Sequence, residues 1–181
     1  SIDLKRGIDG RIERVAEDQR VFSRILGRTF EISAIVTLAG LLLGYPLAYW
    51  LSTLPARRAN LLLILVLVPF WTSILVRVAA WIVLLQREGL VNKALTSLSI
   101  VAEPLALLFN RVGVVVAMTH ILLPFMILPL YSVMKSVPPS YLRAAISLGS
   151  PPLAAFFRVY VPQTYAGIGA GALLVFILSI G

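Results

Sequence analysis

The side chains that could perform covalent chemistry are few and scattered in this sequence of 181 residues. His120 is the only histidine, and the absence of cysteine excludes a disulfide framework, a thiolate metal site and a catalytic thiol from these residues. An enzyme that works on membrane lipids would need clustered carboxylates, histidines or a bound metal near the bilayer surface. Because the sequence offers isolated acids instead, we expect neither catalytic residues nor a metal site in this chain.

The stretch with the most specific pattern is a loop. It covers residues 138–162, reads PPSYLRAAISLGSPPLAAFFRVYVP, and contains basic residues without any acid. Ser140 is a suitable N-cap for a short helix that Gly149 would end. Pro151 and Pro152 would begin the next helix. The pattern predicts a helix, turn, helix unit that lies outside the bilayer.

Two interpretations of this unit remain open from the residues alone. Small Ala144 and Ala145, flanked by Arg143 and by aromatic side chains, would fit closely into a groove on another protein. The aromatic residues are Tyr141, Phe156 and Phe157. Alternatively, the unit is an amphipathic linker that rests on the lipid headgroups.

Three residues inside the apolar runs are candidates for the path of a transported solute. An arginine such as Arg77 costs roughly 2.5–3.5 kcal/mol at the centre of a membrane helix, and therefore usually faces water or a partner. Alternatively, Arg77 extends to the outer interface. Trp71 and Trp81 would offer aromatic faces to a cationic solute, or they anchor and pack the helices at the interface.

Two further polar residues within the runs have structural roles in our interpretation. We expect His120 to form a hydrogen bond between helices rather than to carry protons. We expect Glu31 close to the start of a helix, where the helix dipole favours an anion.

The composition indicates which solvent surrounds the folded chain. It is 59% hydrophobic and 13% charged, whereas soluble domains contain about 25% charged residues. The net charge of +8 resides in the polar stretches between apolar runs, so anionic lipid headgroups explain it better than nucleic acid does. We therefore expect an all-α protein that is embedded in the lipid bilayer and binds no nucleic acid.

Four apolar runs have the length of membrane spans, which need about 20 residues each. They cover residues 29–51, 61–85, 112–134 and 164–181, with prolines inside the second and third runs that indicate kinks. Because the last run stops inside a span, we expect the chain to be a fragment with further spans in the complete protein. Gly167, Gly169 and Gly171 predict close helix packing, and a nucleotide-binding glycine loop is disfavoured because no strand precedes them.

The polar segments divide the chain into a lead-in, residues 1–28, and a transmembrane domain, residues 29–181. From Arg11 to Arg28 apolar residues recur at helical spacing, which indicates an amphipathic surface helix or an ordinary solvated lead-in. The connection from Gln86 to Arg111 contains apolar stretches suited to short interfacial helices. The connection from Lys135 to Gln163 contains the loop described above.

The loop and two other stretches resemble the permeases of binding-protein-dependent ABC importers. That family carries a cytoplasmic loop written E-A-A, three residues, G, nine residues, I-x-L-P. With every spacing matched and an arginine in place of the glutamate, the corresponding positions are Arg143, Ala144, Ala145, Gly149, Val159, Val161 and Pro162. The stretches 43–49, LGYPLAY, and 68–72, VPFWT, look like those of spermidine/putrescine-type permeases.

The resemblance implies a polytopic transmembrane helix bundle of the type I ABC importer permease fold in a bacterial inner membrane. It also implies a cytoplasmic ABC ATPase dimer that receives the loop, a second permease subunit, homologous or identical, and an extracytoplasmic solute-binding protein. ATP and Mg would be bound by the ATPase, because this chain lacks the G-x-x-x-x-G-K-[ST] loop. The implied function is uptake of a small solute, with polyamines favoured, by alternating access.

The orientation implied by the loop conflicts with a plain count of basic residues. If residues 135–163 are cytoplasmic, the connection with Arg57 and Arg58 is cytoplasmic too, and these inner segments carry five Lys and Arg and no acid. The segments assigned to the outside carry ten, seven in residues 1–28 and three in residues 86–111. We give the loop pattern more weight than the count.

Two other classes of function share this composition. A membrane-integral enzyme would need clustered chemical groups that the sequence does not offer, and a channel or scaffold would have no use for a docking loop. Co-purification with an ATPase subunit would distinguish the three classes.

Overall fold

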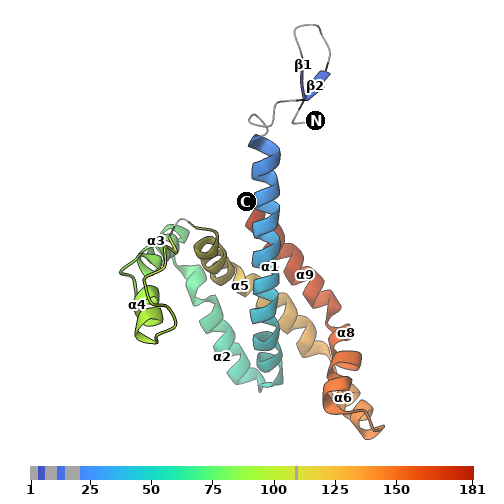
Figure 1. Ribbon diagram of the computed structural model, residues 1–181. Helices are drawn as coiled ribbons and strands as arrows, with labels where there is room; N and C mark the ends of the chain where they lie inside the picture. Colours follow the sequence, from blue (N-terminus) through green and yellow to red (C-terminus); the bar gives the residue numbers. More distant parts are fainter. Residues whose placement is uncertain (1–3, 7–11, 15–20, 109) are drawn as a thin grey trace.

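The computed structural model describes residues 4–6, 12–14, 21–108 and 110–181 (Figure 1). A two-stranded antiparallel hairpin, β1 (Leu4–Arg6) and β2 (Ile12–Arg14), precedes a bundle of helices. The helical segments are α1 (Val21–Thr53), α2 (Ala56–Leu67), the 3₁₀ helix η2 (Val68–Trp71), α3 (Ile74–Leu85), α4 (Leu90–Ser97), α5 (Arg111–Ser136), α6 (Pro139–Ser147), α7 (Pro152–Ala155), the π-helix η3 (Phe156–Tyr160), α8 (Val161–Gln163) and α9 (Tyr165–Ile180). The predicted helix bundle is therefore confirmed.

Two helices are by themselves long and apolar enough to cross a membrane, Arg24–Thr53 within α1 and the whole of α5. Two further pairs of helices reach the necessary length only across a bend. The bend is 92° between Ala56–Trp71 and Ile74–Ser97, and 62° between Pro152–Gln163 and Tyr165–Ile180. By length and composition, the described residues thus supply two to four crossings.

The centre of the bundle is the packing of α1, α5 and α9 against one another (Figure 1). Met126 of α5 is fully buried there. A Cβ placed on Gly44 of α1 would lie 2.9 Å from Met126 Cγ, and a Cβ placed on Gly171 of α9 would lie 2.9 Å from Met126 Sδ. Glycines on both sides therefore let the three backbones approach around one methionine side chain.

A layer of apolar side chains extends this contact along the bundle. Its other buried members are Val36, Ala48, Leu51, Leu122, Ile127, Leu130, Met134, Tyr160 and Val175. Since they come from α1, α5, η3 and α9, they join the helices that enclose Met126 to the segment that precedes α9.

The glycines of α9 confirm close helix packing at two of the three predicted positions. A Cβ on Gly167 would lie 3.1 Å from Val133 Cβ of α5, and Gly171 faces Met126. Gly169 has open space on its side of the helix. The packing face follows the four-residue spacing that brings small residues to one side of a helix.

The second apolar run, expected as one span over residues 61–85, consists of two helices that meet at a bend. Pro69 lacks the N–H that an α-helix needs, and the chain narrows to a 3₁₀ helix there. Thr72 is extended, with φ −91° and ψ 146°, and Ser73 Oγ accepts a hydrogen bond of 3.3 Å from the N–H of Leu75 at the start of α3. As a result, α3 leaves the direction of α2 and lies with α4 at the edge of the bundle (Figure 1).

The connection before α5 contains a short helix, α4, as the apolar stretches in this connection predicted. Asn92 is fully buried within the connection. Its Nδ2 donates to the carbonyls of Gln86 and Leu105 at 3.0 and 2.9 Å, and its Oδ1 accepts from the N–H of Leu105 at 2.9 Å. These three bonds hold the two ends of the connection together.

The N-terminal segment differs from the amphipathic helix expected between Arg11 and Arg28. Residues Ile12–Arg14 form a strand that pairs with Leu4–Arg6, and α1 begins at Val21. The part of the prediction that falls on residues 11 and 15–20 lies outside the described residues. The expected position of Glu31 at a helix start is wrong, because α1 has already begun at Val21.

Two contacts show which connections share an end of the bundle. Glu31 of α1 forms a salt bridge of 3.0 Å with Arg111 at the start of α5. Lys135 near the end of α5 donates to the carbonyls of Ser52 and Leu54 at the end of α1, at 3.1 and 2.9 Å. An α-helix rises by about 30 Å from residue 31 to residue 52, which matches the hydrocarbon core of a bilayer. The α1–α2 turn and the loop after α5 therefore lie at the same end, as the predicted topology requires.

Replacing Gly171 with leucine is expected to destabilise the bundle, because the new side chain would overlap with Met126. Overpacking of this kind typically costs about 1–3 kcal/mol. The matched control is Gly169→Leu, where a Cβ meets nothing within 4 Å. Thermal unfolding of the full-length protein in detergent should give a lower Tm for Gly171→Leu alone, and equal Tm values for both variants would contradict the packing described here.

Candidate functional site

The loop singled out in the sequence forms the helix, turn, helix unit that its pattern predicted, α6 followed by α7. The unit begins earlier than expected. Pro139 is the first residue of α6, and the N-cap is Pro138 instead of Ser140, without a side-chain hydrogen bond. Proline is well suited to the first helical position, because the N–H that it lacks would have no partner there.

Gly149 ends α6, as predicted, through a left-handed backbone conformation with φ +90°. Its N–H donates to the carbonyl of Ile146 at 2.9 Å, and the N–H of Ser150 donates to the carbonyl of Ala145 at 3.1 Å. These two bonds form a Schellman motif. A side chain at Gly149 would have space around it, but the backbone conformation disfavours residues that carry a Cβ.

The chain returns to the bundle through η3 and α8. Val159 and Val161 are half-buried along this return, and Pro162 is exposed. At the bend into α9, the hydroxyl groups of Thr164 and Tyr45 lie 3.1 Å apart and form a hydrogen bond. The bend is therefore tied to α1.

Tyr49 of α1 anchors the returning segment. Its ring meets the ring of Phe156 edge on, with centroids 5.1 Å apart, and the ring of Tyr160 in the same manner at 5.3 Å. Phe156 and Tyr160 stack on each other at 5.4 Å. Phe156 thus faces the bundle, and its predicted place on a docking surface is wrong.

The unit exposes several large apolar side chains beside polar ones such as Ser147 and Arg158. The exposed apolar side chains are Tyr141, Ile146, Leu148, Leu153 and Phe157, which we call the outer loop surface and whose exposed fractions run from 41% at Ile146 to 89% at Leu148. Ala144 is exposed and Ala145 half-buried in the same helix. An apolar patch at the polar end of a bundle is typical of an interaction site.

Behind α6 lies a cavity of about 390 Å³, between α6 and the ends of α1 and α5. It is lined by Tyr49, Ser52, Thr53, Met134, Lys135, Val137, Pro139, Leu142, Arg143 and Tyr160, and we call it the inner cavity. Burial raises the pKa of the Tyr160 phenol above its ordinary value. The charged groups of the lining are Lys135 and Arg143, both cations.

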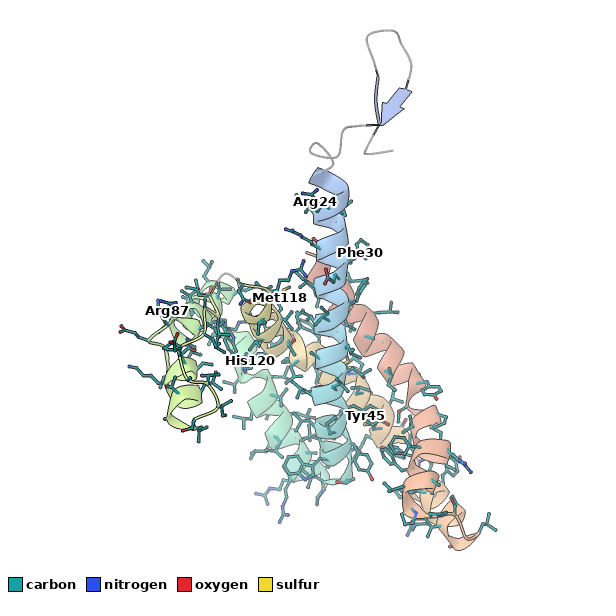
Figure 2. The ribbon with its side chains drawn as sticks, in the orientation of Figure 1. Arg24, Phe30, Tyr45, Arg87, Met118 and His120 are labelled. Atoms are coloured by element: carbon teal, nitrogen blue, oxygen red, sulfur yellow. The ribbon has the colours of Figure 1, made fainter. Side chains whose placement is uncertain are left out.

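The three residues predicted for a solute path lie on η2 and α3, at the edge of the bundle. Trp71 is 91% exposed. The guanidinium of Arg77 lies 5.4 Å from the ring centroid of Phe70, and its Nε is buried without a hydrogen-bond partner among the described residues. The ring of Trp81 meets the ring of His120 of α5 edge on, with centroids 5.3 Å apart. His120 is labelled in Figure 2. His120 thus links two helices through ring packing.

Sequence reasoning missed the side chains that hold the loop to α1. Tyr49 lies in an apolar run and Tyr160 in the loop, so their contact depends on how α1 packs against η3. Lys135 offered a weak signal, because it is the first charged residue after a long apolar run. A cation at that position is well placed to bind carbonyls at a neighbouring helix end.

No model of a protein family matches the chain. It is 38% identical to the spermidine/putrescine transport system permease protein PotB of Escherichia coli strain K12, over 89% of the chain and 58% of that protein. It is 37% identical to PotB of Haemophilus influenzae, over 89% of the chain and 56% of that protein. It is 31% identical to the inner membrane ABC transporter permease protein YdcU of Escherichia coli strain K12, over 87% of the chain and 54% of that protein.

The described residues include helices long and apolar enough to cross a membrane, which agrees with the membrane transport permeases that the chain resembles. The chain belongs to the ABC transporter permeases, and the resemblance seen in its sequence is confirmed. It spans 58% of the length of the Escherichia coli PotB protein.

Replacing Lys135 with glutamine is expected to loosen the end of α1, because the carbonyls of Ser52 and Leu54 lose their cationic donor. Lys135 is exposed, so we expect a cost of about 1 kcal/mol, the net value of an ordinary hydrogen bond, and about fivefold faster amide exchange in residues 52–60. Hydrogen exchange of the full-length protein measures this change. Arg58→Gln removes a charge from the same turn and serves as the control, and an equal rise in both variants would contradict the role of Lys135.

Proposed function

We propose that this chain is part of the transmembrane permease subunit of an ABC importer, and that its α6–α7 unit couples the helix bundle to an ATPase. The outer loop surface carries this proposal. Leu148 and Phe157 are exposed to 89% and 64% at the end of the bundle, where apolar side chains need a protein partner to cover them. The other side of the same unit is anchored to the bundle, so a partner that moves the unit also moves the helices.

The connections of the unit support transmission of such a movement. Only Val137 and Pro138 separate α5 from α6, and proline restricts the backbone at this junction. On the other side, Tyr160 packs against Tyr49, and Thr164 bonds to Tyr45. A displacement of the unit would therefore act on α1, α5 and α9 together.

The partners follow from the same assignment. A cytoplasmic ABC ATPase dimer would bind ATP and Mg and would receive in its clefts the loop that contains Arg143, Ala144, Ala145, Gly149, Val159, Val161 and Pro162. A second permease subunit, identical or homologous, would complete the transmembrane pathway, and an extracytoplasmic binding protein would deliver the solute. The complete protein would cross a bacterial inner membrane several times and would work by alternating access.

A small organic cation of the polyamine class is the proposed substrate. The support is the likeness to two permeases whose names include spermidine and putrescine, at 38% and 37% identity. Trp71 and Trp81 would contact such a cation through their ring faces. Arg77, which is held over Phe70, would repel a cation and would border the path instead of binding the solute.

The orientation can be tested by labelling single cysteines, because the 181 residues contain none. Leu148→Cys in the outer loop surface should react with a membrane-impermeant maleimide from the cytoplasmic side only, and assembly with the ATPase should protect it. Leu98→Cys after α4 is the matched control, since Leu98 is also exposed, at 69%, and should react from the opposite side. Reaction of Leu148→Cys from outside the cell would refute the proposed coupling.

Replacing Gly149 with valine should uncouple ATP hydrolysis from uptake, because a β-branched residue is strained at φ +90° and would change the turn between α6 and α7. We expect at least about a tenfold loss of uptake from a strain of about 1–3 kcal/mol, with the permease still inserted. Uptake and ATP hydrolysis would be measured on the reconstituted complex. Gly149→Asn is the control, since asparagine tolerates a left-handed backbone, and should retain most of the uptake. Unchanged uptake in Gly149→Val would count against the docking role.

A further inference from the structure

The positive charge of the inner cavity is not balanced by acidic residues in the adjoining segments of the chain. The two segments at this end of the bundle, residues 52–60 and 135–163, contain no acid. Their basic residues are Arg57, Arg58, Lys135, Arg143 and Arg158. The salt bridge among the described residues, between Glu31 and Arg111, lies at the other end. Only Lys135 and Arg143 of these five cations line the cavity.

Hydrogen-bond donors in the cavity remain available to a ligand. Lys135 Nζ uses two of its three N–H groups on the carbonyls of Ser52 and Leu54, and Arg143 offers five more. The hydroxyl groups of Ser52 and Thr53 donate to helix carbonyls at 2.7 Å, so they do not serve as donors here. Tyr49 and Tyr160 add phenol hydroxyl groups to the lining. The donors that carry charge are both cationic, and they favour an anionic oxygen ligand over a neutral one.

The position of the cavity indicates the source of such an anion. It lies where α1 and α5 end, about 30 Å along α1 from Glu31, and this is the level of the lipid headgroups if these helices cross the bilayer. Apolar Met134, Val137 and Leu142 line the cavity beside the cations. A phosphodiester that carries acyl chains matches both kinds of lining, because the phosphate would pair with the cations and the chains would contact the apolar side chains.

We propose that the inner cavity binds the phosphodiester headgroup of an anionic phospholipid, held by Arg143 and Lys135. An acidic side chain of the ATPase fits less well, because the cavity lies between α6 and the ends of α1 and α5, with apolar Met134, Val137 and Leu142 in its lining. With the glutamate of the family pattern at position 143, the lining would hold one cation and one anion and would lose its preference for phosphate. Lipid binding at this cavity is independent of whether the outer loop surface docks onto an ATPase.

The test is retention of phosphatidylglycerol by the full-length permease, purified in its complex in detergent and measured by native mass spectrometry. Arg143→Gln should retain about fivefold less lipid, the effect of one basic residue on binding to an anionic lipid. Arg143→Lys keeps the charge and should restore retention, which excludes misfolding as the cause. Arg58→Gln removes a cation from the same end without touching the cavity and should retain lipid as the unmodified protein does.

Three further results decide the question. Phosphatidylcholine, which has no net charge, should be retained less than phosphatidylglycerol, and equal retention would overturn the proposal. Displacement of phosphatidylglycerol by inorganic phosphate would support the phosphate site and identify a soluble source for the ligand. Retention that appears only after the ATPase is removed would show that the ATPase fills the cavity, and would overturn the proposal as well.

Discussion

The insertion of Met126 between glycines of two neighbouring helices is the contact on which the rest of the structure depends. Gly44 of α1 and Gly171 of α9 leave no space for a Cβ at their approach to this side chain. Lipid tails give helices no hydrophobic reason to associate, so close contact of this kind is what holds a membrane bundle together. Because α1, α5 and α9 meet here, Tyr45 and Tyr49 lie beside the segment that leads into α9.

If the α6–α7 unit couples the bundle to an ATPase as proposed, its contacts with the bundle would transmit the movement. A small external unit can move membrane helices only if it does not swing freely on its connections. Three contacts restrict the movement of the unit relative to the bundle. They are the ring packing around Tyr49, the hydrogen bond between Thr164 and Tyr45, and the hydrogen bonds from Lys135 to the end of α1. Gly149 lies between α6 and α7, and its left-handed backbone conformation sets the turn that would face the proposed partner.

The short helix α6 separates two chemically different surfaces. Apolar side chains such as Tyr141 and Leu148 are exposed on the outer loop surface, whereas Arg143 lines the inner cavity together with Lys135. A protein partner and an anionic lipid would therefore occupy different sides of one helix. The exclusively basic character of this end also agrees with the tendency of basic residues to remain on the cytoplasmic side of a membrane.

The sequence by itself determined the helical class, the approximate runs that form α1, α5 and α9, the turn at Gly149 and the family, because these follow from hydrophobic length, backbone sterics and a spaced pattern of residues. Only the tertiary structure decided that α3 turns at Ser73, that Glu31 pairs with Arg111, that Phe156 faces inward and that Arg143 lines a cavity. Each of these depends on a neighbour supplied by a distant part of the chain, or on the direction in which a helix continues after a break. Local sequence rules contain no information about such neighbours, since they describe one segment at a time.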